Sequence, residues 1–184
     1  MARTPSNMLP LGTRAPEFNL LDTVSDQQTS LADLSGEKGT VIMFICNHCP
    51  FVVHVNSELV AIANSYSDRG ISFIAISSND VINYPQDGPD HMKVNAKENN
   101  YPFPYLYDAS QDVAKAYEAA CTPDIYLFDA QLKLVYRGQL DDSRPGNGIP
   151  LTGRDLRTAL DDLLAGQDIS SVQKPSIGCN IKWK

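Results

Sequence analysis

The sequence CNHC at residues 46–49 carries the side chains of this 184-residue chain that are best suited to chemistry. Two cysteines separated by two residues can bind a metal, form a structural disulfide, or alternate between dithiol and disulfide. A structural zinc site usually takes two such pairs, and no second close pair of ligands is present. A disulfide across so short a loop removes little chain entropy. The pattern therefore favours redox exchange.

The elements around the pair predict how it is positioned. Gly39–Ile45 is apolar and β-branched, as in a strand buried on both faces. The apolar residues from Val52 to Tyr66 are spaced by three and four, which indicates one stripe of a helix. Ile71–Ser77 predicts a second buried strand, so the three elements form a βαβ unit. The cysteine pair lies at its first strand-to-helix junction.

That junction suits a reactive thiol. A free thiol with a pKa of about 8.5 is only about 3% thiolate at pH 7. At a helix N-terminus, unpaired N–H groups and the helix dipole stabilise an anion. We therefore expect Cys46 to be the attacking thiolate and Cys49 to resolve the mixed disulfide. His48 lies between them, and a nearby imidazolium would favour the thiolate further.

Composition limits the protein classes that fit. The length suits one compact domain, and 42% hydrophobic with 20% charged residues is ordinary for a globular chain. The net charge of −7 argues against nucleic-acid or anionic-membrane partners, because the only basic cluster is Lys182 and Lys184. The longest apolar run, Val41–Cys46, is far too short to span a membrane, and no signal-peptide core is visible. We therefore expect a cytoplasmic protein with reduced cysteines.

The second half of the chain predicts further strands and helices around a polar insertion. Residues Ser78–Pro104 form the insertion, with a short helix after Gly88-Pro89. Thr152 and Asp155 resemble a capping box that starts a last helix ending at Gly166. The remaining predictions are strands at Glu17–Asp22, Tyr105–Asp108, Asp124–Asp129 and Leu132–Gln139, a helix after Ser110, and a C-terminal tail at Gln167–Lys184.

Several motifs in combination resemble the thioredoxin-like superfamily. "APEFNLLD" at Ala15–Asp22, the segment leading to CNHC, and Thr122-Pro123 before a strand resemble its redoxin branch, which groups alkyl-hydroperoxide-reductase-like proteins with thiol–disulfide oxidoreductases. The resemblance covers roughly Thr13 to Ala165. It implies an α/β fold with a central mixed sheet flanked by helices. We expect one such domain over residues 1–184, with an N-terminal extension, the insertion and the tail.

The resemblance also implies roles for residues. Cys46 would be the nucleophile and Cys49 the resolving cysteine, with His48 in the catalytic motif. Pro123 would be a cis-proline that presents the backbone near Thr122 to an extended substrate, and Asn47 would also contact substrate. The implied activity is thiol–disulfide exchange without a metal or organic cofactor. Its substrates would be protein or small-molecule disulfides and thiols, with electrons from an unidentified reductase or thiol donor.

The chain also departs from the pattern of these families. Gly39 and Met43 stand where peroxidatic cysteines of the branch are preceded by Pro and by Thr or Ser, and Met43 has no hydroxyl. The strand Thr40–Ile45 has no acid to move a proton off the resolving thiol, so His54 is a candidate base. Two alternatives therefore stay open: a thiol peroxidase, and a non-enzymatic redox-sensing or zinc-binding module.

Two further cysteines have no fixed role in the sequence. Cys121 precedes Pro123 by two residues, so a proline loop facing the pair would bring it close to Cys46. It is either a small buried residue or a third redox thiol. Cys179 lies in the tail and is either an inert packing residue or a resolving partner that folds back.

Overall fold

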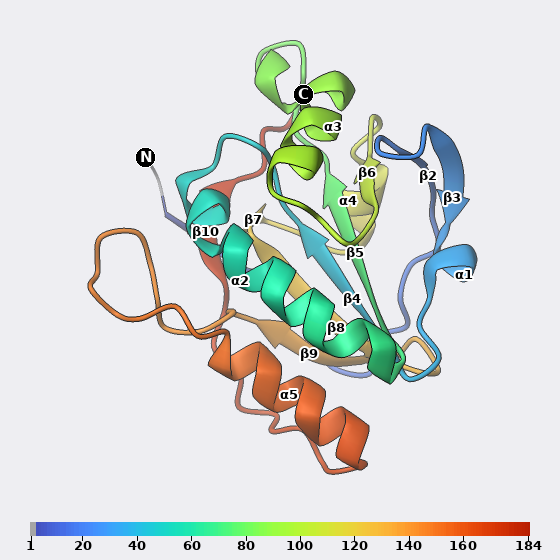
Figure 1. Ribbon diagram of the computed structural model, residues 1–184, viewed down its shortest axis with the longest axis vertical. Coiled ribbons are helices and arrows are strands. Elements are labelled where there is room, and N and C mark those ends of the chain that lie inside the picture. The colour runs from blue at the N-terminus through green and yellow to red at the C-terminus, as the bar shows by residue number, and fades with distance from the viewer. Residues whose placement is uncertain (1–2) are drawn as a thin grey trace.

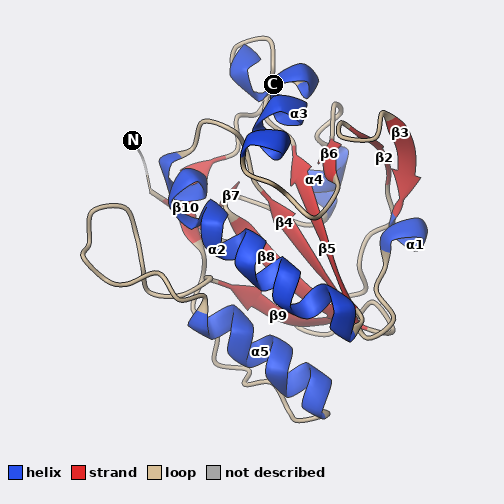
Figure 2. Cartoon of the chain, in the orientation of Figure 1, coloured by secondary structure: helices blue, strands red, loops and turns tan. Residues whose placement is uncertain are grey.

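The computed structural model describes residues 3–184 and is built on a seven-stranded mixed sheet (Figures 1 and 2). Strands β4, β5 and β6 run parallel, and the other neighbours pair antiparallel. In sheet order the strands are β3 (Gln27–Ser30), β2 (Asn19–Asp22), β6 (Tyr105–Tyr107), β5 (Ile71–Ser77), β4 (Gly39–Phe44), β8 (Asp124–Asp129) and β9 (Leu134–Gly138). The predicted α/β fold with a central mixed sheet is confirmed.

Helices flank this sheet on both faces. In Figure 1 the longest helix, α2, crosses in front of the strands, and α5 lies below β9; both helices contribute to one core cluster. The helices are α1 (Leu31–Leu34), α2 (Pro50–Tyr66), α3 (Pro89–Glu98), α4 (Asp112–Ala116) and α5 (Arg154–Ala165), with 3-10 turns η1 (Ser67–Arg69) and η2 (Pro85–Asp87). None of these described helices has the length and apolar character needed to cross a bilayer.

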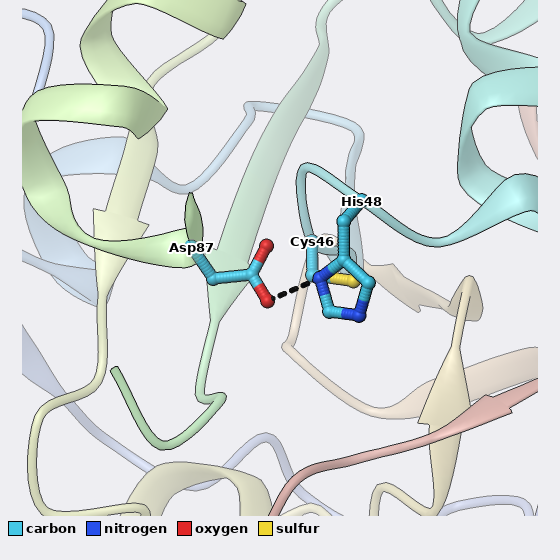
Figure 3. Close-up of side chains that lie close together, drawn as sticks. All are labelled: Cys46, His48 and Asp87. Carbon is cyan, nitrogen blue, oxygen red and sulfur yellow. Dashed lines mark ion pairs between the residues drawn. The ribbon is translucent and has the colours of Figure 1, made fainter. Parts of the chain in front are cut away.

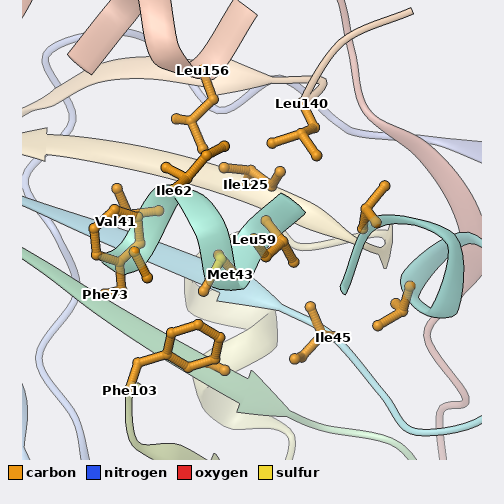
Figure 4. Close-up of a cluster of buried hydrophobic side chains, with 14 of the residues drawn as sticks. Val41, Met43, Ile45, Leu59, Ile62, Phe73, Phe103, Ile125, Leu140 and Leu156 are labelled. Carbon is orange, nitrogen blue, oxygen red and sulfur yellow. The ribbon is translucent and has the colours of Figure 1, made fainter. Parts of the chain in front are cut away.

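The central strand β4 divides the core by the alternation of its side chains. Val41 and Met43 face the cluster under α2 and α5, part of which Figure 4 shows. Ile42 and Phe44 face the opposite cluster, which includes Tyr117 after α4. All four β4 side chains are almost fully buried. A strand covered on both faces must be apolar throughout, which is why this segment reads as a continuous hydrophobic run.

A second, three-stranded sheet contains the C-terminal tail. Strand β10 (Ile177–Asn180) lies between β1 (Thr4–Pro5) and β7 (Cys121–Thr122), antiparallel to both. The tail predicted from residue 167 onward is therefore partly an ordered strand. The segment predicted as an N-terminal extension contributes β1 to the same sheet. Strand β10 thus lies directly beside the segment that precedes Pro123, and β1 lies on the other side of β10.

Most predicted elements occur near their expected bounds, but two helix starts differ. The last helix has Gly153 as its N-cap and no capping side chain, so the predicted capping box is wrong. The carboxylate of Asp141 accepts the backbone N–H and the hydroxyl of Thr152 instead. Helix α2 starts at Pro50, with Cys49 as its N-cap. The prediction that Cys46 sits at this helix N-terminus is thus displaced by three residues.

Candidate active site

The cysteine pair occupies the junction between β4 and α2. Cys46 lies two residues beyond the end of β4, and Cys49 precedes Pro50, whose missing N–H suits the first helical position. Both cysteines are almost fully buried and in the reduced form. The unpaired N–H groups of the first helical turn lie next to Cys49, not Cys46. The effect expected of the helix dipole therefore acts mainly on the second cysteine.

The proline loop faces both sulfurs, as the family resemblance implies. The Thr122–Pro123 peptide bond is cis. The Thr122 hydroxyl lies 3.5 Å from the Cys46 sulfur, and the Cys49 thiol donates to the Thr122 carbonyl at 3.2 Å. One residue thus contacts both thiols, with its side chain on one and its backbone on the other.

The pKa values of the two thiols of the pair are shifted in opposite directions. The hydrogen bond with Cys46 lowers the pKa of Cys49 most, burial raises it, and hydrogen bonds with the Cys179 thiol, the Thr122 side chain and the Val52 backbone lower it further. The same hydrogen bond raises the pKa of Cys46, as do burial and the negative charge of Asp87. In the reduced pair the thiolate is therefore favoured on Cys49, the reverse of the sequence-based expectation.

A buried carboxylate that the sequence did not reveal adjoins the pair. Asp87, at the end of η2, is fully buried. Its oxygens accept the Asn47 backbone N–H at 2.9 Å and the Asn79 amide at 2.8 Å, and lie 2.6 Å from the Nδ1 atom of His48. Figure 3 shows Asp87 and His48 meeting beside the Cys46 sulfur. The insertion thus supplies the acid that β4 lacks. Its only local signal is an acid before Gly88, which is common in turns.

The two residues inside the motif are anchored by the insertion. The Asn47 side chain donates to the Gln86 carbonyl at 2.8 Å and accepts the Tyr105 hydroxyl at 3.0 Å. The His48 ring stacks on Tyr84 at 5.7 Å, and its side chain remains 28% exposed. Asn47 therefore holds the loop in place, and its substrate-binding role stays a prediction. His48 is therefore partly exposed, whereas Cys46 is 1% exposed.

The predicted alternative base points elsewhere. The Nε2 atom of His54 lies 2.8 Å from the Ser143 hydroxyl. Both residues line a small pocket that Pro123 also lines. Within residues 3–184, His54 makes no hydrogen bond to either thiol of the pair. The His48–Asp87 pair is therefore better placed to exchange a proton with Cys46.

The two remaining cysteines lie in different surroundings. The Cys121 thiol donates to the Pro123 carbonyl at 3.5 Å, and burial raises its pKa. The Cys179 sulfur lies 2.8 Å from that of Cys49. The expected closeness of Cys121 to Cys46 does not appear among the hydrogen bonds of the described residues. The tail cysteine is the one in contact with the pair.

Three groups at the site have the types and spacing of metal ligands. The Cys46 sulfur, a His48 ring nitrogen and an Asp87 oxygen all lie within 4.8 Å of one another. Zinc accepts such donors, so the spacing argument against zinc is weaker than the sequence suggested. Asp87 already accepts two N–H donors besides its contact with His48. That hydrogen-bonding pattern suits a carboxylate that orients an imidazole.

The sheet, the cis-proline loop and the cysteine pair together define a thioredoxin-like fold of the redoxin type. Residues 11–137 match the family model described as "AhpC/TSA family", and the chain belongs to that family. The resemblance predicted from the motifs is thus confirmed at this level. No curated protein matches the chain.

Two solved structures are similar over almost the whole chain, and a third shares the fold. An uncharacterised conserved protein of Geobacillus kaustophilus is 60% identical, with a TM-score of 0.98, 100% of this chain covered and 97% of the other. A hypothetical protein of Sinorhizobium meliloti is 48% identical, with a TM-score of 0.96 and 98% of each chain covered. The thioredoxin domain of a Bacteroides vulgatus thiol-disulfide oxidoreductase is 22% identical, with a TM-score of 0.60 over 74% of this chain and 90% of that one, and shares the fold.

Proposed function

We propose that this protein is a thiol–disulfide oxidoreductase that works through Cys46 and Cys49. The observation that carries the proposal is the contact of both sulfurs with Thr122, next to a cis-proline. The hydrogen bond between the two thiols supports a pair that can join as a disulfide. The opposite shifts of their pKa values support different roles for the two sulfurs.

In the reducing direction, Cys46 attacks a substrate disulfide. Its proton passes to His48, which Asp87 orients, and one substrate sulfur leaves as a thiolate. The Cys49 thiolate then attacks the Cys46 sulfur, forms the Cys46–Cys49 disulfide and releases the second substrate thiol. Cys46 is assigned the first attack because it adjoins the partly exposed His48, whereas Cys49 is covered by Thr122 and Cys179.

The substrates would be protein or small-molecule disulfides or thiols, and a reductase or small thiol would return the electrons. No organic cofactor takes part in these steps. The net charge of −7 supports neither nucleic acid nor an anionic membrane as a partner. We propose the cytoplasm as the compartment, where thiols are kept reduced.

A redox titration in glutathione buffers tests this function. We expect a disulfide between Cys46 and Cys49, and its loss in Cys46→Ser, while Cys121→Ser titrates like the unmodified protein. Metal analysis of the reduced protein accompanies the titration. A pair that stays reduced at every glutathione ratio would refute the proposal. So would stoichiometric zinc that is lost together with Cys46 and Cys49.

A thiol peroxidase is the second candidate, and one contact favours it. The frame expected for a peroxidatic cysteine has a hydroxyl where this chain has Met43, which is buried in the core. The Thr122 hydroxyl at 3.5 Å from Cys46 supplies such a group from another strand. Peroxide consumption that disappears in Cys46→Ser and falls strongly in Thr122→Val, but persists in Thr122→Ser, would support this activity.

A further inference from the structure

The sulfurs of Cys46, Cys49 and Cys179 lie next to one another in space at the site, although the motif contains only the first two. Cys49 is hydrogen-bonded to Cys46 on one side and lies 2.8 Å from Cys179 on the other. A disulfide bond is about 2.05 Å long, so a small movement would join Cys49 to Cys179. All three side chains are buried, at 1%, 0% and 3% exposure in chain order. Cys49 is therefore the shared neighbour of two possible disulfide partners.

Backbone pairing fixes the position of Cys179. Strand β10 lies antiparallel to β7 with Cys179 opposite Thr122, the residue that contacts both other sulfurs. A Cβ atom on Gly178 would lie only 1.9 Å from the Thr122 carbonyl oxygen, so the approach requires glycine. The Ile181 N–H donates to the Ala120 carbonyl at 3.1 Å and extends the pairing. The tail occupies the β7 edge where the sequence predicts that an extended substrate binds.

We propose that Cys179 is a third redox thiol, which exchanges with the Cys46–Cys49 disulfide to form a Cys49–Cys179 disulfide. The inference rests on the proposed function and adds an internal substrate to it. In the step, the Cys179 sulfur attacks the Cys49 sulfur, the Cys46–Cys49 bond breaks, and Cys46 leaves as a thiolate. The proton lost by Cys179 ends on Cys46. One disulfide replaces another, so no external oxidant or reductant is needed.

The causes of the pKa shift of Cys179 are compatible with exchange from the Cys46–Cys49 to the Cys49–Cys179 disulfide. In the reduced protein, burial raises the pKa of Cys179, and so do the hydrogen bond and the negative charge of Cys49. Oxidation of Cys49 removes the last two causes, whereas the Lys182 charge that lowers the pKa remains. Cys179 thus becomes more acidic once the Cys46–Cys49 disulfide forms. His48 and Asp87 lie beside Cys46, where the proton must arrive.

Exchange would change what the oxidised protein can do. With the disulfide between Cys46 and Cys49, Cys46 has no free thiol and cannot attack a substrate. With the disulfide between Cys49 and Cys179, Cys46 is again a thiol beside the solvent-exposed edge of His48. The oxidised protein would then hold a buried Cys49–Cys179 disulfide, while the thiol of Cys46, its first nucleophile, stays reduced.

Labelling of the oxidised protein tests the exchange. The protein is oxidised with oxidised glutathione to one disulfide per molecule, alkylated in the native state, quenched in acid and digested with trypsin without reduction. Cys46 and Cys49 share the tryptic peptide 39–69, Cys121 lies in 116–133 and Cys179 in 158–182. We expect a fraction of molecules with 39–69 cross-linked to 158–182 and the alkyl label on Cys46.

Three variants make the result decisive. Cys179→Ser should reduce the Cys46 label at least tenfold, whereas Cys121→Ser, which removes a buried thiol outside the chain of three, should leave it unchanged. Cys46→Ser should still cross-link 39–69 to 158–182. If the disulfide stays within 39–69 and Cys46 is never labelled, the relay is refuted but the proposed function survives. If Cys179→Ser forms no disulfide within 39–69, the proposed function itself fails.

Discussion

Cys46 and Cys49 face different partners although only two residues separate them. Cys46 adjoins the carboxylate of Asp87, a like charge that disfavours its thiolate. Hydrogen bonds with the thiols of Cys46 and Cys179 and with the Val52 backbone favour the thiolate of Cys49. At the residue scale, the partition of charge within the pair thus follows from which neighbours can donate. The hydrogen bond between the two thiols of the motif has the largest effect, and Asp87 from the insertion and Cys179 from the tail increase the difference.

Replacing Asp87 by Asn should lower the pKa of Cys46. The substitution removes the negative charge that contributes to the raised pKa, so the midpoint of the thiolate titration should move to lower pH. The measurement is the pH dependence of ultraviolet thiolate absorbance in a Cys49→Ser background, where Cys46 is the only thiol of the pair. The same background with Asp90→Asn, an exposed acid three residues away, is the matched control. A midpoint that stays in place or rises would contradict the assigned electrostatics.

At the scale of elements, the site is assembled from parts that are distant in the chain. The β4–α2 junction holds the cysteines, η2 brings Asp87, and β7 and β10 bring Thr122 and Cys179. Each of these segments is short or irregular apart from β4 and α2. Because such segments are held by long-range pairing, their positions depend on the complete fold.

Substituting Gly178 by Ala tests whether β10 is held by its close approach to β7. The added methyl group would overlap the Thr122 carbonyl, so β10 must shift. We expect the free energy of unfolding in urea to fall by about 1–3 kcal/mol, and native-state alkylation of Cys179 to become several times faster. Val172→Ala, on the exposed part of the same tail, is the control. Unchanged stability together with unchanged labelling would show that the tail is not held in this way.

The sequence predicts local features of the site better than its long-range contacts. Periodicity locates β4, α2 and β5 because each buries a regular apolar face. The cis-proline could be expected only through the family resemblance, since most X–Pro bonds are trans. Asp87 and Cys179 were not placed, because a carboxylate in a polar insertion and a cysteine in a tail show no periodic signal. Strand pairing and hydrogen bonds across 40 to 130 residues brought them to the pair.

At the scale of the whole molecule, stability should depend on pH through Asp124. This residue follows Pro123, is fully buried, and one of its oxygens lacks a hydrogen bond within residues 3–184. Burial raises its pKa from 3.8 to about 6. The folded state therefore binds this proton more tightly than the unfolded state. The resulting stabilisation is complete below pH 4 and is lost as the pH rises through about 6.

Asp124→Asn should remove this pH dependence and stabilise the protein at neutral pH. The shift of about two units corresponds to at most about 3 kcal/mol, so we expect a gain of about 1–3 kcal/mol at pH 7.5. Urea unfolding between pH 4 and 8 measures it. Asp168→Asn, an exposed acid in the tail, should leave the profile unchanged. A variant that is no more stable than the unmodified protein at pH 7.5 would contradict the assignment.

The contact between Cys49 and Cys179 links positions 130 residues apart. A disulfide there would close a loop through most of the chain, whereas one between Cys46 and Cys49 closes a loop of about four residues. Loop-closure entropy in the unfolded chain gives roughly 5 kcal/mol for the long loop and roughly 2 kcal/mol for the short one. Oxidation should therefore raise the melting temperature of both variants. The increase for Cys46→Ser should exceed the increase for Cys179→Ser by about 6–12 °C. Calorimetry measures both increments, and equal increments would contradict the expectation. Exchange of the disulfide from Cys46 to Cys179 would thus change the heat resistance of the entire protein without changing its overall oxidation state.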